Sequence, residues 1–421
     1  MADATDRTEP TERTGPTRTT GPAGLPAWVW ASGEESSDPL VHHDGTTVRV
    51  DELGGTGHLD RMEQDCADIA GLGCTAWRYG MPWQRTEVEP GVYDWSLWDR
   101  ALAAAEAAGL EVVVDLCHFG LPDHLPGFCD PSWVDAFLRY VDAFLARYPQ
   151  PRWFTPVNEP TTTAFCSALW GAWNDGRSSA DDYARALVLC ELADAEAAAR
   201  IRADRPAALL GAEALSLPAA VHPDRAEEAE LELLRWFAAF DLRSGHEVDP
   251  AVAPMFDAVP DPWLDRLAAV AGTDGVVAGH DLYPASVQAW PAAGEEPSHL
   301  SIEDRIETWA TLAHRFADRY RVPIWVAETS NLGLPVADGP AWLTALSGAC
   351  AELRAAAVDV RGICWYSRGD QLDWDRALVP PAGEVTTVGL FDLGRRARPV
   401  GTGARPPFQA PVVKPSTSVA A

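Results

Sequence analysis

Positive charge, long apolar runs and closely spaced cysteines are scarce in this sequence. Its 421 residues carry 62 acidic side chains against 33 lysines and arginines, which gives a formal net charge of −29. A surface this negative repels phosphate backbones and anionic lipids, so we expect neither nucleic acid nor a membrane surface as a partner. No run approaches the roughly 18 uncharged apolar residues that a membrane-spanning helix needs.

The cysteine spacing argues against a disulfide framework, and the start of the chain argues against a secretory signal. The eight cysteines form no Cys-x-x-Cys pair and several lie in apolar runs, which predicts buried thiols in a cytoplasmic protein rather than a disulfide framework. Residues 1–24 lack the apolar stretch of a secretory signal and have the composition of a disordered leader. We expect one domain over residues 25–403 and a tail over residues 404–421, and the oligomeric state stays open.

Apolar β-rich runs alternate with Ala-rich segments of helical period along the rest of the chain. The predicted strands span residues 27–31, 75–80, 111–117, 152–157, 208–213, 275–283, 323–328 and 362–367. The predicted helices span residues 95–110, 131–148, 180–204, 223–245, 301–320 and 340–357. Strands that are apolar on both faces and separated by helices are typical of parallel sheets covered by helices. Eight such units predict a single α/β domain of the (β/α)8 TIM-barrel type.

No Gly-x-Gly-x-x-Gly follows the first predicted strand, which argues against a dinucleotide-binding fold, and we expect no cofactor. In barrels, functional side chains stand where the strands end. Glu159 and Glu328 both stand at such ends, and two carboxyl groups in different environments are the minimum for cleaving a glycosidic bond. Arg78 is suited to keep one of them ionised. Pro160 is expected to push Glu159 toward an extended conformation.

Several stretches resemble the retaining β-glycosidases of glycoside hydrolase family 1. "WFTPVNEP" is similar to the block that ends strand four of that family, whose Glu is the acid/base, and "IWVAETSN" resembles the strand-seven block whose Glu is the nucleophile. Similar blocks follow in register: "PAWVWASGEESS", "AWRYGMPW", "EPGVYDWSLWDRALAAAEAAGLEVVVDL", "LCHFGLPDHL" and "GHDLYP". The resemblance covers roughly residues 26–400, and several blocks on the matching strands are more specific than any single one.

The resemblance implies a role for each matching residue. Glu159 is the implied acid/base and Glu328 the implied nucleophile of a retaining hydrolase that uses no metal and acts on a small glycoside. The other implied residues are Arg78 and Tyr283 beside the nucleophile, Asn158 at the sugar 2-hydroxyl, His118 at another hydroxyl, and Trp365 as the sugar platform. The 18 tryptophans agree with a carbohydrate ligand, because indole faces stack on sugar rings.

Two loops depart from the family pattern. The first strand-end loop reads "SGEESSD", so Glu34 or Glu35 occupies the region where the family usually has a Gln. The loop after strand eight, "WYSRGDQLDWDRAL", carries Asp370, Asp373 and Asp375. These departures predict an atypical substrate, and the added carboxylates would suit an amino sugar or a cationic aglycone unless they form a solvated face.

Other interpretations stay open. One is a transglycosidase on the same barrel, and another is a barrel that binds a glycoside or metabolite without turning it over. A metal-assisted lyase is disfavoured because no set of three strand-end carboxylates is evident, and adjacent pairs such as His280 and Asp281 point to opposite faces of a strand. His118 could be a core histidine, and packing is the default for Cys117 and Cys166.

Overall fold

Eight parallel strands close into one barrel in the computed structural model, which describes residues 22–402. Around the barrel the order is β1 (Val29–Glu34), β4 (Ala76–Gly80), β7 (Glu111–Asp115), β8 (Trp153–Thr155), β9 (Ala208–Leu210), β11 (Val276–Asp281), β13 (Ile324–Thr329) and β14 (Val360–Trp365), which pairs with β1 again. Each of the eight predicted strands overlaps one of these. The predicted (β/α)8 fold is confirmed.

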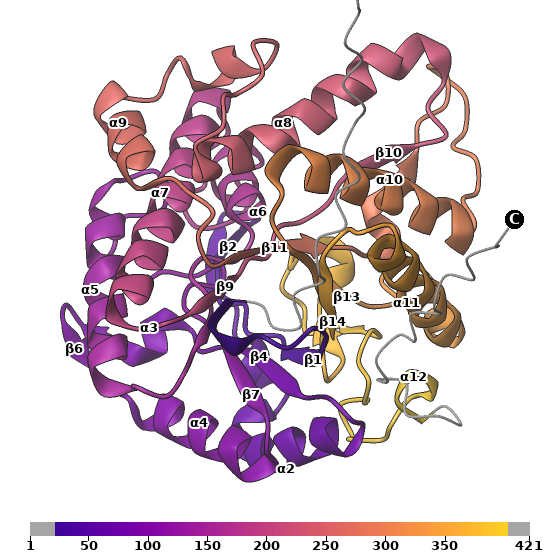
Figure 1. Cartoon of the computed structure of the whole chain (residues 1–421). Coiled ribbons are helices and arrows are strands. Elements are labelled where there is room, and N and C mark those ends of the chain that lie inside the picture. The colour runs from indigo at the N-terminus through magenta and orange to yellow at the C-terminus, as the bar shows by residue number, and fades with distance from the viewer. Residues whose placement is uncertain (1–21, 403–421) are drawn as a thin grey trace, which may run out of the picture.

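Helices surround the strands on all sides (Figure 1). The longer ones are α2 (His58–Gly71), α4 (Ser96–Ala108), α5 (Ser132–Arg147), α7 (Ala180–Asp204), α8 (Ala226–Ser244), α9 (Asp261–Val270), α10 (Ile302–Tyr320) and α11 (Gly339–Ala355). The short ones are α1 (Glu52–Gly55), α3 (Trp83–Thr86), α6 (Pro160–Ala164) and α12 (Pro399–Thr402). All six predicted helices are present, and α2 and α9 come in addition to them.

The loops contain pairs of short strands. They are β2 (Leu40–His43) with β3 (Thr46–Arg49), β5 (Glu87–Glu89) with β6 (Val92–Tyr93), β10 (Leu217–Ala219) with β12 (Val287–Ala289), and β15 (Gln371–Leu372) with β16 (Val385–Thr386). Two of the pairs, β2–β3 and β15–β16, lie in the loops that follow β1 and β14. These loops therefore have structure of their own at the functional end of the barrel.

Local sequence signals explain where the helices begin and end. The Ser179 hydroxyl accepts a hydrogen bond from the backbone N–H of Asp182 and so caps the first turn of α7. Ser301 and Asp304 form a capping box at the start of α10. Helix α4 ends at Gly109, whose φ of 72° is left-handed and costs glycine little.

The hydrophobic core has two layers, because successive side chains of a strand point to opposite faces. Small and aromatic residues fill the barrel interior, among them Ala31, Ala76, Trp153 and Trp325. The larger layer lies between the strands and the surrounding helices. Which layer a strand residue enters decides whether its side chain can reach the mouth of the barrel.

The state of the cysteines, the character of the helices and the extent of the described residues bear on further predictions from the sequence. All eight cysteines are buried and none is in a disulfide, as predicted. Within residues 22–402, no helix combines the length and the apolar character needed to cross a bilayer. Most of the predicted leader and the whole predicted tail lie outside the described residues.

Candidate active site

Glu328 stands at the end of β13, held by two donors from other strands. One Arg78 Nη donates to its Oε1 at 2.5 Å, and the Tyr283 hydroxyl donates to its Oε2 at 2.6 Å. Arg78 is buried on β4, and the charges of Asp115 and Glu328 hold the pKa of its guanidinium well above the usual value despite burial. The two charge-assisted bonds fix the orientation of the Glu328 carboxylate. The sequence predicts both contacts.

Glu159 follows β8 and has an unusual backbone conformation. Its φ of 39° and ψ of 67° are left-handed, so the expectation of an extended conformation is wrong. Pro160 disfavours the right-handed helical region for the residue before it, and here the chain takes the left-handed alternative and enters α6 with Pro at its first position. A left-handed non-glycine residue of this kind costs about 1–3 kcal/mol and is held by the surrounding structure.

The Glu159 carboxyl group is poised to carry a proton near neutral pH. It is 7% exposed, and burial, together with the charge of Glu328, raises its pKa to about 7. Glu328 is 5% exposed and accepts a hydrogen bond from the Arg78 guanidinium, whereas Glu159 has no such partner within the described part of the chain. The two glutamates therefore occupy different electrostatic environments across one barrel mouth, as the sequence predicts.

A third carboxyl group, from Asp281 at the end of β11, joins the pair. Oxygen atoms of Glu159, Asp281 and Glu328 all lie within 4.8 Å of one another. Asp281 is the register partner of Glu328 on the neighbouring strand. The expectation that no three strand-end carboxylates come together is therefore wrong. The pairing of β11 with β13 places Asp281 beside Glu328, which the sequence around Asp281 does not reveal.

A hydrogen-bonded network joins the remaining predicted residues to Arg78. The guanidinium also donates to Asp115 at 2.7 Å and to the Asn158 side-chain oxygen. Asp115 in turn bonds Nδ1 of His118 at 2.9 Å, and Nε2 of His118 lies 3.4 Å from the Asn158 amide nitrogen. Burial lowers the pKa of His118, but the Asp115 charge and hydrogen bond outweigh it and raise that pKa. His118 therefore lies in this polar network rather than in the apolar core.

The comparisons with known proteins agree with this geometry. The family model described as glycosyl hydrolase family 1 matches residues 33–247, just over half of the chain. The chain belongs to glycosyl hydrolase family 1. The matched range includes Glu159 and Arg78 but ends before Glu328.

Individual relatives are β-glucosidases at low identity. This family 1 chain is 24% identical over 365 residues to a β-glucosidase of Agrobacterium sp., covering 75% of this chain and 77% of that enzyme. It is 28% identical over 169 residues to β-glucosidase 42 of Arabidopsis thaliana, a match spanning 35% of this chain and only one third, 33%, of that relative. The family 1 β-glucosidase of Thermotoga maritima, solved with isofagomine lactam, superimposes with a TM-score of 0.72 at 16% identity, over 91% of this chain and 97% of that one.

The prediction for Trp365 is wrong. Its side chain is fully buried in the layer between strands and helices, where its indole N–H donates to the Val388 carbonyl at 2.9 Å. The next residue, Tyr366, faces the barrel interior instead. Its ring stacks on His118 with centroids 6.0 Å apart and lies 5.4 Å from the Arg78 guanidinium carbon. Strand alternation thus gives this family 1 member a tyrosine beside His118 and Arg78.

Glu34 and Glu35, at the end of the first barrel strand, contact different parts of the structure. Glu34 accepts two hydrogen bonds from Arg368, at 2.7 and 2.9 Å, and ties this strand end to the loop after β14. Glu35 faces the catalytic side, 3.8 Å from Nε2 of His118, and accepts from the Gln371 amide at 3.2 Å. Burial raises the pKa of Glu35. Glu35 is therefore the residue of this pair that is placed to meet a ligand.

The aspartates after β14 mostly hold their own loop. Asp370 accepts from Arg398 and from the backbone N–H of Gly389. Asp373 accepts from three consecutive backbone N–H groups, those of residues 382–384, and from Arg376 at 2.9 Å. Only the side chain of Asp375 is largely exposed. These contacts occupy the carboxylates of Asp370 and Asp373, so the structure does not support assigning these two residues to a cationic aglycone.

An apolar cluster of side chains lies in the loops at this end of the barrel. It is formed by Val41, Phe119, Cys166, Ala172, Trp173 and Leu378, which follow four different barrel strands. Burial raises the pKa of the Cys166 thiol, which is a packing residue here, as is Cys117. Nearby, Trp170 is 43% exposed and is the indole of this region most open to solvent. Loops distant in sequence thus converge around the catalytic end.

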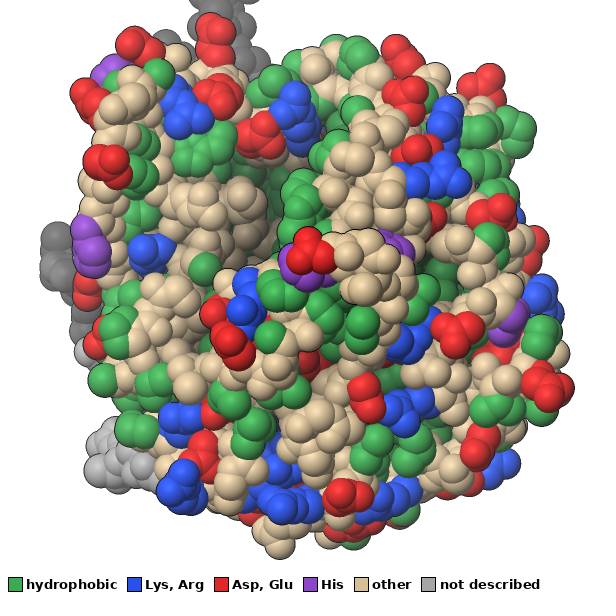
Figure 2. Space-filling model, turned by 180° about the vertical axis from the view of Figure 1, so that it is seen from behind, with side chains coloured by type: hydrophobic (Ala, Val, Ile, Leu, Met, Phe, Trp, Pro, Cys, Tyr) green, Lys and Arg blue, Asp and Glu red, His purple; other side chains and the backbone are tan. Residues whose placement is uncertain are grey.

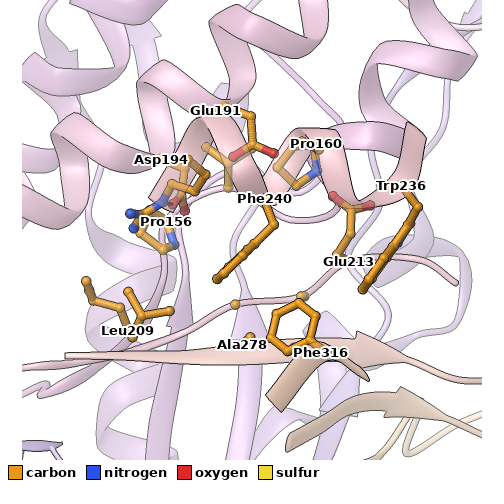
Figure 3. A pocket seen from close by; sticks show the side chains of 17 residues that line it. Pro156, Pro160, Glu191, Asp194, Leu209, Glu213, Trp236, Phe240, Ala278 and Phe316 are labelled. Carbon is orange, nitrogen blue, oxygen red and sulfur yellow. Dashed lines mark hydrogen bonds and ion pairs between the residues drawn. The ribbon is translucent and has the colours of Figure 1, made fainter. Parts of the chain in front are cut away.

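A cavity of about 60 Å³ lies behind the Glu159 loop, between the strands and helices α7 and α8. Figure 3 shows Glu191 and Glu213 among the aromatic side chains of Trp236, Phe240 and Phe316. Burial, with the Glu159 charge, raises the pKa of Glu213 to about 8, although part of its surface is accessible. The sequence does not identify Glu213 as a candidate site residue, because many residues with a purely structural role also follow a strand.

Two groups of carboxylate and histidine side chains in the described residues are spaced closely enough to share a cation. They are Glu159, Asp281 and Glu328, and a second set of Glu34, His58 and Asp65. A guanidinium already contacts each set, Arg78 in the first and Arg368 in the second. That positive charge competes with a metal ion, so neither donor set fits a cation well.

Proposed function

We propose that this family 1 chain is a retaining β-glycosidase that hydrolyses a small glycoside by double displacement. The observation that carries the proposal is the pairing of two glutamates with oxygens within 4.8 Å and opposite electrostatic surroundings. Retaining enzymes hold their two carboxyl groups about 5–5.5 Å apart, whereas inverting enzymes leave room for water at about 6.5–9.5 Å.

The first step makes a covalent glycosyl-enzyme. An Oε of Glu328 bonds to the anomeric carbon while the bond from that carbon to the leaving oxygen breaks and Glu159 gives its proton to that oxygen. Arg78 and Tyr283 hold the attacking carboxylate in position. The raised pKa of Glu159, about 7, keeps the proton available near neutral pH.

The second step releases the sugar with its original anomeric configuration. Glu159, now a carboxylate, takes a proton from water, whose oxygen bonds to the anomeric carbon as the bond to Glu328 breaks. Asn158 and His118 are positioned by Arg78 and Asp115 to hold sugar hydroxyls. Glu35 and Tyr366 add a carboxyl group and an aromatic ring beside His118. The proposed substrate therefore differs from a plain glucoside in the chemical groups that contact these two residues.

Glu328→Gln is expected to abolish hydrolysis of chromogenic β-glycosides, because a neutral amide is a poor nucleophile. Glu328→Ala should regain activity with added azide, which occupies the space of the carboxylate and attacks in its place. The matched control is Glu352→Gln on the exposed face of α11, which should behave as wild type. Turnover by Glu328→Gln close to wild type would show that the nucleophile is wrongly assigned.

Transfer of the sugar to an alcohol is a second candidate, favoured by the low exposure of both glutamates, 7% and 5%. A shielded intermediate meets less water, and an acceptor that fills the mouth would then compete well. Product analysis with and without alcohol acceptors separates the two. A transglycosidase would form the alkyl glycoside as its main product at acceptor concentrations where a hydrolase still releases mainly free sugar.

A further inference from the structure

Asp281 is buried among charged groups yet has no hydrogen-bond donor of its own. Its side chain is fully buried, and neither carboxyl oxygen has an N–H or O–H donor among residues 22–402. Glu328, by contrast, receives one donor on each oxygen. An ionised carboxylate without donors in a buried site is strongly disfavoured, whereas the protonated acid is not.

The carboxyl group of Glu159 lies beside Asp281, and oxygen atoms of these two acids and of Glu328 lie within 4.8 Å of one another. Ionised carboxylates this close, with no donor on Asp281 from the described residues, repel one another. A proton on Asp281 or Glu159 removes this repulsion and supplies the donor for a hydrogen bond between them. Asp281 is the more buried of the two and holds its proton more strongly, so its O–H donates to an oxygen of Glu159.

The charged and titratable groups around Asp281 agree with a neutral acid. They are Glu328 on β13, Glu159 after β8, Arg78 on β4, the neutral Tyr283 phenol after its own strand β11, and the neutral Cys364 thiol on β14. The Arg78 charge is already shared by Glu328 and Asp115. Burial and the charges of Glu328 and Glu159 raise the pKa of Asp281 well above its usual value.

We propose that Asp281 is a positioning residue that stays protonated through the reaction and donates a hydrogen bond to the acid/base Glu159. This inference rests on the proposed function for its catalytic meaning. When Glu159 gives up its proton in the first step, the Asp281 O–H faces a new carboxylate, and the bond becomes charge-assisted. The interaction thus makes Glu159 a stronger acid than burial alone would allow, without adding a negative charge beside the nucleophile.

The first test needs no substrate, so it remains decisive if the proposed activity fails. Infrared spectra of the full chain at pH 9 are compared for wild type and Asp281→Asn, a pH at which Glu159, with a pKa of about 7, is ionised. The wild-type-minus-variant difference should contain the carbonyl stretch of one protonated carboxylic acid. A difference containing carboxylate bands instead would overturn the proposal. Matching circular dichroism and thermal midpoints show that both proteins are folded.

The second test uses the pH profile of kcat/KM. Asp281→Asn keeps a neutral donor, so the basic limb set by Glu159 should stay within about half a pH unit of wild type. Asp281→Leu loses the donor, and the limb should move up by about one pH unit or more. If Asp281 is instead ionised, Asp281→Asn removes a like charge and the limb moves down by a similar amount, which contradicts the proposal.

The leaving group supplies a readout that a purely structural role would not move. With Asp281→Leu, alkyl glycosides, which need full protonation, should lose about tenfold more activity than activated aryl glycosides. Asp281→Asn should show no such split. An equal loss for both substrate classes in the leucine variant would assign Asp281 to packing alone.

Discussion

At the scale of single residues, the proposed mechanism depends on different surroundings for acids of one residue type. Glu328 has a guanidinium and a phenol as donors, whereas Glu159 has a buried carboxyl group as its neighbour. In the proposed mechanism, the same residue type therefore serves as the nucleophile in one place and as the acid in the other, a few ångströms away. The left-handed backbone of Glu159 aims its side chain at this point.

Replacing Glu159 tests its role as acid/base. Wild-type kcat/KM should fall as pH rises through about 7, because Glu159 then loses the proton that it must donate. Glu159→Gln should lose this basic limb and about 10²–10⁴-fold of its activity on alkyl glycosides, with a smaller loss on aryl glycosides that leave without protonation. Steady-state kinetics across pH 5–9 with both substrate classes provide the measurement. A variant that keeps the wild-type limb would assign that titration to another group.

At the scale of helices and strands, the barrel mouth is made rigid by contacts between loops that are far apart in sequence. Glu34 at the end of β1 pairs with Arg368 after β14, and Arg368 reaches Asp65 on α2 at 3.0 Å. Behind the mouth, α7 instead contributes an isolated acid. Glu191 is 4% exposed and faces the cavity of Figure 3, and its carboxyl group forms no hydrogen bond or ion pair among the described residues.

Glu191 should make the fold less stable as pH rises. Burial raises its pKa well above 4.5, so the folded protein binds a proton that the unfolded chain has lost, and the unfolding free energy falls with pH above that value. Glu191→Gln removes the effect and should gain stability over wild type between pH 5 and pH 8, at up to about 1.4 kcal/mol per pH unit. Urea unfolding at both pH values is the measurement, with Glu352→Gln as the exposed control. An equal difference from wild type at the two pH values would mean that Glu191 is ionised in the fold.

At the scale of the whole molecule, the net charge is strongly negative. Acidic and basic side chains are interspersed over the face shown in Figure 2, although the chain as a whole carries a formal charge of −29. A net charge of this size creates a long-range field that favours cations and repels anions, and salt screens it over about 10 Å at 0.1 M ionic strength.

The field should affect which aglycones are accepted, independently of the catalytic step. At low ionic strength, kcat/KM for an aryl glycoside with a cationic aglycone should exceed that for its anionic counterpart by several-fold, and the ratio should shrink toward one as salt is added. Initial rates from 10 to 300 mM salt measure this. A ratio that does not change with salt would place the preference in local contacts such as Glu35 and not in the overall charge.

Much of the fold and part of the site can be predicted from the sequence for definite physical reasons. Continuous apolar runs bounded by capped helices specify buried parallel strands, so all eight barrel strands were predictable. The contacts of Arg78 and Tyr283 with Glu328 follow from their strand-end positions in a closed barrel. Trp365 and Tyr366 show the limit, because a shift of one residue moves a side chain from the catalytic face to the helix-covered face.

By itself, the sequence determined the class of fold, the two glutamates at strand ends, and the absence of close cysteine pairs, since these depend on local periodicity and residue type. Only the tertiary structure decided that Asp281 joins the two glutamates, that Glu35 and not Glu34 faces the site, and that Asp370 and Asp373 hold their own loop. The reason is that strand register and loop closure set distances between residues hundreds of positions apart, and side-chain protonation follows from those distances and from burial.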